Sequence, residues 1–216
     1  MIYAGIENYF YYEYRRSYFT MIKLKIIVAG AKDVGKTSLI RRYIHGTFQT
    51  DVKSTIGVDF MTKQLESNGS KVRLSIWDFG GEEKFRSLFP SYCSGASAAI
   101  ILFDITDRES FNDLNNWLEL IEGAAGTIIK MLIGSKHDLV DQAIISQEEI
   151  DSLIDKHNFD LFMYTSAKTG ENVKDLFTKL TQKIIDTNLR ECPHCHELIA
   201  QNLYFCTFCG KEIPQK

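Results

Sequence analysis

Apolar and polar residues alternate in blocks along most of the 216-residue chain, and the blocks predict strands and helices in turn. Short apolar runs rich in β-branched residues are typical of buried strands; they occur at residues 23–29, 58–66, 71–77, 97–104, 128–134 and 159–164. Apolar residues at helical spacing predict helices over residues 38–45, 109–121, 146–156 and 173–187. Strands separated by helices imply an α/β fold, with a mostly parallel six-stranded sheet covered by helices on both faces.

Two local signals refine this fold. Residues 67–70 read Ser-Asn-Gly-Ser between two strands, and Asn-Gly is a hairpin signal, so one edge of the sheet is expected to be antiparallel. Ser146 followed by Glu149 predicts a capping box at the start of a helix. Ligands of such folds bind at the carboxyl ends of the strands.

Residues 30–37 read Gly-Ala-Lys-Asp-Val-Gly-Lys-Thr and follow the first strand directly. They match the phosphate-binding pattern G-x-x-x-x-G-K-[ST], whose glycines let backbone N–H groups turn toward an anion. Lys36 can place an ammonium on the outer phosphates, and the Thr37 hydroxyl is a hard oxygen ligand for Mg²⁺. The octet therefore predicts a nucleoside triphosphate site.

A second segment, Ser-Lys-His-Asp at residues 135–138, follows the strand at residues 128–134. A carboxylate at Asp138 can accept hydrogen bonds from both N1–H and the 2-amino group of guanine, whereas adenine offers neither. Sites built for such hydrogen bonds can discriminate by roughly 10⁴ or more. This segment favours guanine as the base.

With these motifs the sequence resembles the Ras superfamily of small GTPases, most closely the Rab branch, over residues 23–185. Residues 54–60 (Ser-Thr-Ile-Gly-Val-Asp-Phe) resemble its first switch, residues 77–82 (Trp-Asp-Phe-Gly-Gly-Glu) its second, and residues 165–168 (Thr-Ser-Ala-Lys) its last base-contact loop. The resemblance implies a P-loop NTPase small G domain over residues 21–187. It also implies a switch in which GTP and Mg²⁺ order two loops that hydrolysis releases.

The resemblance assigns roles to individual residues. Thr55 is expected to bind Mg²⁺ by its hydroxyl and the γ-phosphate by its N–H, Asp78 to hold Mg²⁺ through a water, and Gly81 to sense the γ-phosphate. Phe48 is expected edge-on to the guanine ring, and the Ala167 N–H is expected to reach the guanine carbonyl. The full nucleotide-binding set is Gly30, Lys32, Asp33, Val34, Gly35, Lys36, Thr37, Ser38, Phe48, Thr55, Asp78, Gly81, Ser135, Lys136, Asp138, Ser166, Ala167 and Lys168.

Glu82 is the first departure from the family pattern, because it stands where the family usually has the Gln that orients the attacking water. An ionised Glu can accept a proton from water but cannot donate a hydrogen bond to the transition state. We expect slow turnover that responds differently to an arginine finger; the alternative is an ordinary slow intrinsic rate. With Lys36 and Gly81, Glu82 makes up the candidate catalytic set.

Two further departures concern Lys32 and Ser135. Lys32 and Asp33 occupy loop positions that are often small in relatives, so Lys32 either crowds an incoming arginine finger, supplies a cation in cis, or points to solvent. Ser135 replaces the usual Asn, and its short hydroxyl is not expected to bridge base and loop as an amide does. Guanine affinity is then expected to fall, whereas base selectivity persists through Asp138.

The C-terminal segment carries Cys192-x-x-Cys195 and, ten residues later, Cys206-x-x-Cys209. Four thiolates from two tight turns suit tetrahedral Zn²⁺ and leave no open position for chemistry. We expect a zinc ribbon over residues 192–213, stabilised by its metal. The alternatives are a redox pair or disulfides.

The environment of these cysteines bears on what the ribbon does. His194 and His196 are either substitute ligands or, as we prefer, solvated residues. Residues 188–216 carry three basic and three acidic residues, which argues against strong nucleic-acid binding and against an RNA factor. Leu198, Tyr204, Phe205 and Phe208 either form an apolar docking face or fill the ribbon core. Two hypotheses remain: a regulatory GTPase with protein effectors and regulators, or a GTP-loaded scaffold whose ribbon recruits a partner.

The chain as a whole is ordinary in composition, with 44% hydrophobic residues and a net charge of −3. It contains no apolar run of membrane-spanning length, and the ending Ile-Pro-Gln-Lys has no cysteine box for a lipid anchor. Four cysteines in metal-binding spacing fit a reducing cytoplasm, with membrane contact only through a partner. Residues 1–20, which hold six of the ten tyrosines, are expected to be a mis-called start before Met21 or an aromatic extension, and residues 188–191 a linker.

Overall fold

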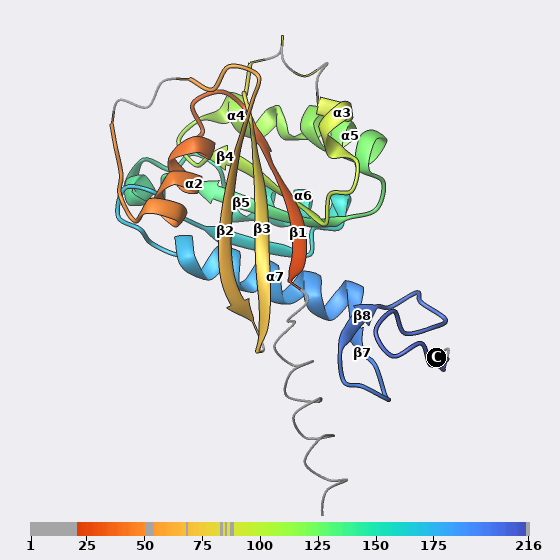
Figure 1. Ribbon diagram of the computed structural model, residues 1–216. Coiled ribbons are helices and arrows are strands. Elements are labelled where there is room, and N and C mark those ends of the chain that lie inside the picture. Colours follow the sequence, from red (N-terminus) through yellow and green to blue (C-terminus); the bar gives the residue numbers. More distant parts are fainter. Residues whose placement is uncertain are drawn as a thin grey trace, which may run out of the picture.

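The computed structural model describes residues 21–50, 54–67, 69–82, 84, 86 and 89–214. The expectations for residues 1–20 and for Asn68 in the hairpin turn lie outside the described residues. The predicted sheet is confirmed (Figure 1). Its strands are β1 (Ile22–Gly30), β2 (Val58–Ser67), β3 (Ser70–Phe79), β4 (Ala98–Asp104), β5 (Ile129–Ser135) and β6 (Leu161–Tyr164), in the order β2-β3-β1-β4-β5-β6.

Strand directions follow from the hairpin prediction. β2 pairs antiparallel with β3, and the remaining neighbours are parallel. In the register of β1, Val28 lies opposite Asp78 of β3 on one side and Ile100 of β4 on the other. The carboxyl ends of β1, β3 and β4 therefore lie next to one another at one end of the sheet.

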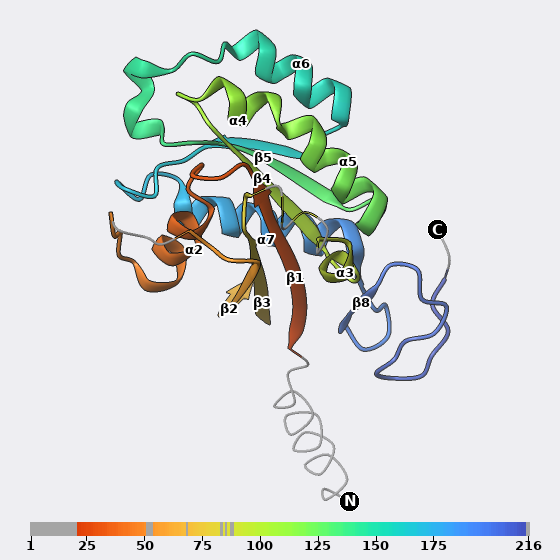
Figure 2. The ribbon, with the colours of Figure 1, turned by 90° about the horizontal axis from the view of Figure 1, so that it is seen from above.

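Helices cover both faces of the sheet (Figure 2). α2 (Lys36–His45) and α7 (Val173–Asn188) pack on one core, and α3 (Phe89–Cys93), α4 (Arg108–Asn112), α5 (Leu114–Ala125) and α6 (Gln147–His157) pack on the other. β1 serves both cores because its side chains alternate: Ile26 and Val28 face the α2 side, and Ile27 and Ala29 face the α5 side.

The helix predicted over residues 109–121 is two helices, α4 and α5, which meet at Asp113. The Asp113 carboxylate caps no backbone N–H of α5; it accepts hydrogen bonds from the side chains of Trp117 (Nε1, 2.9 Å) and Asn116 (2.8 Å). The five-residue α3 and the 3₁₀ segment His137–Gln142 were not predicted, since such short elements leave no periodic pattern.

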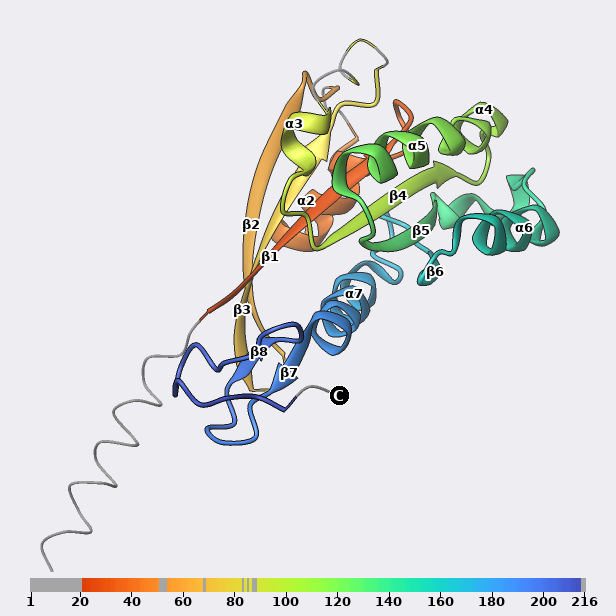
Figure 3. The same cartoon turned by 90° about the vertical axis from the view of Figure 1, so that its right-hand side faces the viewer.

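α7 leads without a break into the C-terminal ribbon (Figure 3). Residues 188–191, which we expected to be a linker, comprise the last residue of α7 and strand β7 (Leu189–Glu191), which pairs antiparallel with β8 (Leu198–Ala200). Gln201 donates its side-chain amide to the carbonyls of Asp186 (3.2 Å) and Leu189 (3.3 Å) and its N–H to that of Asn188. These bonds satisfy the carbonyls at the end of α7 and hold the ribbon against it.

The described residues contain no helix that is both long and apolar enough to cross a membrane.

Candidate functional site

The glycine loop leaves β1 at a sharp turn that its residues make possible. Gly30 has φ 139° and Gly35 φ 94°, both in the region that favours glycine. A Cβ on Gly30 would lie 2.4 Å from the carbonyl oxygen of Leu102 in β4, so the loop is also pressed against the neighbouring strand. Asp33 takes a left-handed conformation (φ 63°) between them, and Val34 is fully buried.

Lys36 lies inside this loop, with only 6% of its surface exposed. Its Nζ donates to the carbonyls of Gly30 (2.8 Å) and Ala31 (2.5 Å). Burial lowers the pKa of Lys36 to about 8, although the nearby Asp78 carboxylate opposes the shift. The Lys36 side chain is thus held inside the glycine loop. Lys36 is also the first residue of α2, and Thr37 and Ser38 follow it in that helix.

Three oxygen-bearing side chains from separate segments converge beside Lys36. The Thr37 hydroxyl lies 2.8 Å from the Thr55 hydroxyl and 2.5 Å from Asp78 Oδ2, and Thr55 lies 3.2 Å from the same carboxylate oxygen. Asp78 Oδ1 is buried and has no hydrogen-bond partner among the described residues. Burial raises the pKa of Asp78 despite the two hydroxyl donors and the Lys36 charge. Hydroxyl and carboxylate oxygens with a spare buried acceptor fit Mg²⁺.

Ser135, at the end of β5, lies between the glycine loop and β4. Its hydroxyl is 2.7 Å from the Val34 carbonyl and 2.8 Å from the Phe103 carbonyl. The short side chain therefore does reach the glycine loop, because β5 and the loop lie close enough for a hydroxyl to span them.

The expected base-binding residues gather at the ends of β5 and β6. Asp138 accepts a hydrogen bond from Ser166 (2.6 Å), and Lys168 Nζ lies 3.5 Å from its other oxygen. Burial favours the protonated carboxyl, but the Ser166 hydrogen bond and the Lys168 charge outweigh it and hold the pKa of Asp138 below its ordinary value. Lys136, in a left-handed conformation, pairs with Asp104 at 2.6 Å. The Asp138 carboxylate is thus ionised and held in place by Ser166 and Lys168.

Two further residues expected near the base have exposed surface. Phe48 is 36% exposed, and Ala167, which follows the buried Ser166, is partly exposed. Both therefore present part of their surface to solvent.

The second switch segment lies against the glycine loop. A Cβ on Gly81 would lie 2.3 Å from the Lys32 nitrogen, so the two backbones touch. Glu82 pairs with Lys84 (2.6 Å) and with Lys32 (3.6 Å), and the Lys84 hydrogen bond is the largest of the effects that lower the pKa of Glu82. Arg86 is directed elsewhere: it pairs with Asp113 and stacks over Trp117.

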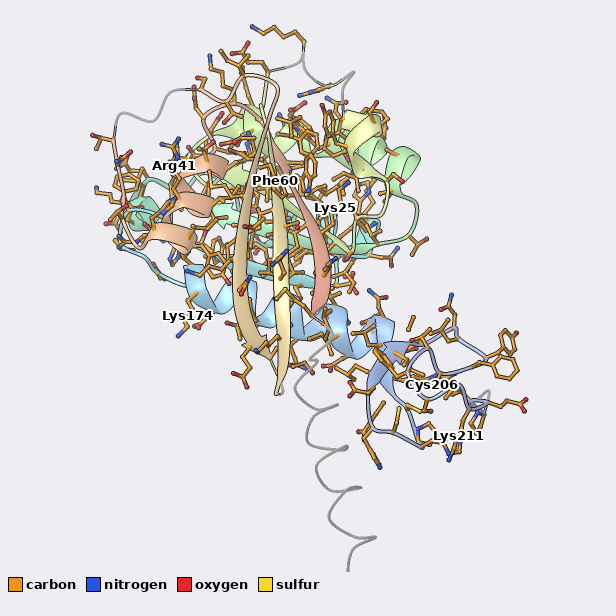
Figure 4. The ribbon with its side chains drawn as sticks, viewed as in Figure 1. Lys25, Arg41, Phe60, Lys174, Cys206 and Lys211 are labelled. Carbon is orange, nitrogen blue, oxygen red and sulfur yellow. The ribbon has the colours of Figure 1, made fainter. Side chains whose placement is uncertain are left out.

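An aromatic cluster beside the switch segments was not predicted. The Phe60 ring lies 5.0 Å from that of Trp77, which lies 5.5 Å from that of Tyr92. Phe60, which is labelled in Figure 4, is 49% exposed. Phe60 and Trp77 are direct partners in the β2–β3 register. Pairing the two strands across the Asn-Gly turn would have placed these rings side by side.

The four cysteines of the ribbon form a second site, with all Sγ atoms within 4.8 Å of one another. Cys192 lies 3.9 Å from Cys209, and Cys195 lies 3.6 Å from Cys206. A disulfide would bring two sulfurs to about 2.05 Å, whereas four sulfurs about 2.3 Å from a tetrahedral zinc are separated by about 3.8 Å. The cluster therefore fits a zinc ribbon.

The protonation of these thiols agrees with a cation site. Burial opposes ionisation of Cys192, but backbone N–H groups, including that of His194, outweigh it and lower its pKa to about 6. Burial and the neighbouring sulfurs raise the pKa of Cys195 to about 12. Once one thiol of the cluster is ionised, its negative charge makes ionisation of a neighbouring thiol unfavourable. A bound cation would offset this repulsion.

Neither histidine of the ribbon contacts the sulfur cluster through its ring. His194 Nε2 lies 3.2 Å from the Glu212 carbonyl, and His196 Nδ1 lies 2.5 Å from Glu191. Tyr204, Phe205 and Phe208 are exposed, whereas Leu198 packs against the core beside α7. Of these four residues, the three aromatic ones are thus exposed and Leu198 is packed.

Comparison with known proteins decides the family. The model of the Ras family matches residues 25–186, well over half of the chain. The chain is 43% identical to the Ras-related protein Rab-30 of Homo sapiens over 162 residues, which are 74% of this chain and 79% of the relative. It is 40% identical to the Ras-related protein Rab-18 of Lymnaea stagnalis over 166 residues, 76% of this chain and 81% of the relative. The chain belongs to the Ras family.

This Ras-family protein is accordingly a Rab-like small GTPase that binds GTP and GDP with Mg²⁺. The ribbon lies outside the match, since its four cysteines all follow residue 186.

Proposed function

We propose that the protein is a Mg²⁺-dependent switch that hydrolyses GTP slowly to GDP and phosphate. The observation that carries this proposal is the convergence of Thr37, Thr55 and Asp78 next to the buried Lys36. Thr55 belongs to the first switch segment, so a Mg²⁺ ion and γ-phosphate bound at this cluster would hold that segment in place.

The phosphate side follows from the residues of the glycine loop. Gly30 to Ser38 supply backbone N–H groups and the Lys36 ammonium to the phosphates, with the start of α2 adding its positive end. Thr37 and Thr55 would hold Mg²⁺ directly, and Asp78 through a water. The ion would neutralise phosphate charge there. The Gly81 N–H would respond to the γ-phosphate, a role supported by the close approach of the Gly81 backbone to the glycine loop.

The base side is built for guanine. Asp138 is ionised and oriented by Ser166 and Lys168, so its two oxygens can accept from N1–H and the 2-amino group. Lys136 would lie along one face of the base, with Phe48 at its edge and the Ala167 N–H on its carbonyl. Ser135 supports the pocket by bonding the glycine loop.

Slow hydrolysis is proposed from Glu82, whose carboxylate is ionised and cannot donate to the transition state. Single-turnover release of γ-phosphate compares the parent with Glu82→Gln. We expect the variant to release γ-phosphate about tenfold faster than the parent. Glu66→Gln, an exposed residue of β2, is the matched control and should equal the parent. Equal rates for parent and Glu82→Gln would dispose of this part of the proposal.

A second candidate function is a GTP-loaded scaffold whose ribbon recruits a protein. It is favoured by the exposed aromatic side chains that flank or lie between Cys206 and Cys209, namely Tyr204 (66% exposed), Phe205 (61%) and Phe208 (36%). Identification of the nucleotide on native protein, followed by a timed assay, separates the two. GTP retained for hours favours the scaffold, and loss of γ-phosphate within minutes favours the switch.

Effectors and regulators are proposed to bind near the Phe60–Trp77–Tyr92 cluster, because Phe60 and Trp77 belong to the two switch segments and the Phe60 ring is 49% exposed. We assign Zn²⁺ to the cysteine cluster, with the ribbon unit at residues 192–213 and the G domain at residues 21–187. Free cysteines in such a cluster fit the cytoplasm, with any membrane contact made through a partner.

A further inference from the structure

Two residues that depart from the family pattern touch each other. Lys32, in the glycine loop, places its Nζ 3.6 Å from Glu82 Oε1 in the second switch segment. The contact is supported by backbone packing, since a Cβ on Gly81 would lie only 2.3 Å from the Lys32 nitrogen. A pair of opposite charges therefore spans two loops that are fifty residues apart in the sequence.

The second partner of Glu82 differs in kind. Lys84 lies 2.6 Å from Glu82 Oε2, but it is only two residues away from Glu82 in the same loop. A pair within one loop persists whether or not that loop lies on the glycine loop, so it cannot favour one arrangement over the other. Of the two ion pairs that Glu82 makes with described residues, the Lys32 pair is the one that forms when the loops meet and breaks when they separate.

We propose that Lys32 is a positioning residue that tethers Glu82 to the glycine loop, and that the pair favours the GTP-bound arrangement of the second switch segment. This inference rests on the proposed function, in which the γ-phosphate holds that segment closed. Lys32 acts through Glu82, so the effect of either substitution depends on the other residue.

The size of the effect follows from the exposure of the pair. The side chains are 51% and 30% exposed, so the charges are screened by water and salt. Exposed pairs of this kind change an equilibrium by roughly 1.5-fold to 5-fold. Both residues lie at the surface, so their substitution is expected to leave the thermal unfolding temperature unchanged.

A double-mutant cycle tests the tether. The parent, Lys32→Met, Glu82→Gln and the double variant are compared by the ratio of the affinities for GTPγS and GDP, and by the single-turnover rate. Lys32→Met should lower the affinity ratio about twofold to fivefold when Glu82 is present and leave it unchanged in the Glu82→Gln background. Lys32→Arg should restore the ratio, and 1 M salt should abolish the difference.

Lys84→Met is the matched control, because it removes a lysine that also contacts Glu82 and should leave the affinity ratio unchanged. An equal loss from Lys32→Met in both backgrounds would mean that Lys32 acts on the nucleotide directly, and would overturn the tether while the proposed function stands. An equal loss from Lys84→Met would overturn it as well. A parent protein that binds neither nucleotide would overturn the proposed function and the tether together.

Discussion

Among single residues, Asp78 connects the start of α2 with the first switch segment, because its carboxylate accepts hydrogen bonds from both Thr37 and Thr55. It lies at the end of β3, opposite Val28 of β1, where the register brings it under the glycine loop. One carboxylate oxygen accepts from Thr37 and Thr55, and the other is buried with no partner in the described part of the chain. Burial of such a group is costly unless a ligand completes it, so the cluster is poised for a cation.

The clearest residue-scale prediction concerns Asp138. Asp138→Asn replaces one of the two acceptor oxygens by an NH2 group, which cannot accept from guanine, and removes the negative charge. One hydrogen bond is therefore lost, and the other is no longer made to a charged group. We expect GTP affinity to fall about 10²-fold to 10⁴-fold, as measured by titration calorimetry.

Asp141→Asn is the control for Asp138→Asn, because Asp141 is an exposed carboxylate in the same 3₁₀ segment. It removes the same charge without touching the base and should bind GTP like the parent. Equal losses for both variants would point to net charge, not base recognition.

Residue identities at the nucleotide site were predictable because each motif has a fixed spacing that chemistry requires, as in Lys36, Thr37 and Asp138. The contact between Lys32 and Glu82 was not, since it depends on how two distant loops pack. The bond from Ser135 to the glycine loop was missed for the same reason: a sequence shows the length of a side chain but not the gap that it must span.

At the scale of elements, α6 begins with a capping box that is confirmed in full, and Glu149 has a second role in it. Its carboxylate bonds Ser146 and pairs with Arg108 of α4 at 2.5 Å. The Arg108 hydrogen bond is the largest of the effects that lower the pKa of Glu149 to about 2. The start of α6 is therefore tied to α4 by a group that stays ionised well into the acid range.

A pH dependence follows with a defined sign. Because the folded-state pKa of Glu149 is depressed below 4.5, its contribution to stability is present above about pH 4.5 and is lost as the pH falls toward 2. Glu149→Gln should lower the unfolding temperature by about 1 to 3 °C at pH 7, and the difference from the parent should shrink below pH 4.5. Glu148→Gln, an exposed neighbour in the same turn, should show no such difference at any pH.

The junction between α7 and the ribbon depends on Gln201, whose amide caps the carbonyls of Asp186 and Leu189. Gln201→Ala should leave these carbonyls to water and increase amide hydrogen exchange in the last turn of α7 by about fivefold, the effect of losing about 1 kcal/mol of local stability. Asn202→Ala, at the exposed next position, should exchange like the parent. Unchanged exchange in Gln201→Ala would show that the side-chain amide does not hold the ribbon against α7.

Elements with long, regular patterns were predictable from the sequence, and the six strands and the capped α6 are examples. The break between α4 and α5 was not, because Asp113 interrupts a helix whose apolar spacing continues through it. β7 was missed because three residues carry no pattern and gain their strand partner only from β8.

At the scale of the whole molecule, the ribbon and the nucleotide site lie at opposite ends of the G domain. β1 begins at Ile22 near the ribbon and ends at Gly30 in the glycine loop, and Figures 1 and 3 show the ribbon beside the lower ends of β1 and α7. Figure 4 places Cys206 far from Phe60 in the same way. The two sites should therefore respond separately to loss of their ligands.

Cys206→Ser tests this separation. Removal of one thiolate should reduce zinc from about one per chain to near zero, as measured by metal analysis, and should leave GTP affinity unchanged. Thr207→Ser, an exposed change within the same knuckle, should retain the metal. Parallel loss of zinc and of GTP binding in Cys206→Ser would show that the two ends fold as one unit.

The central claim is that the glycine loop, the Thr37–Thr55–Asp78 cluster and Asp138 together form a pocket for a guanine nucleotide with Mg²⁺. Titration calorimetry of nucleotide-stripped protein with GTP and with ATP, each in the presence of Mg²⁺, tests it most directly. We predict tight binding of GTP, weakened by chelation of Mg²⁺, and no measurable binding of ATP at the same concentrations. Equal binding of ATP and GTP, or no heat with GTP, would contradict the account.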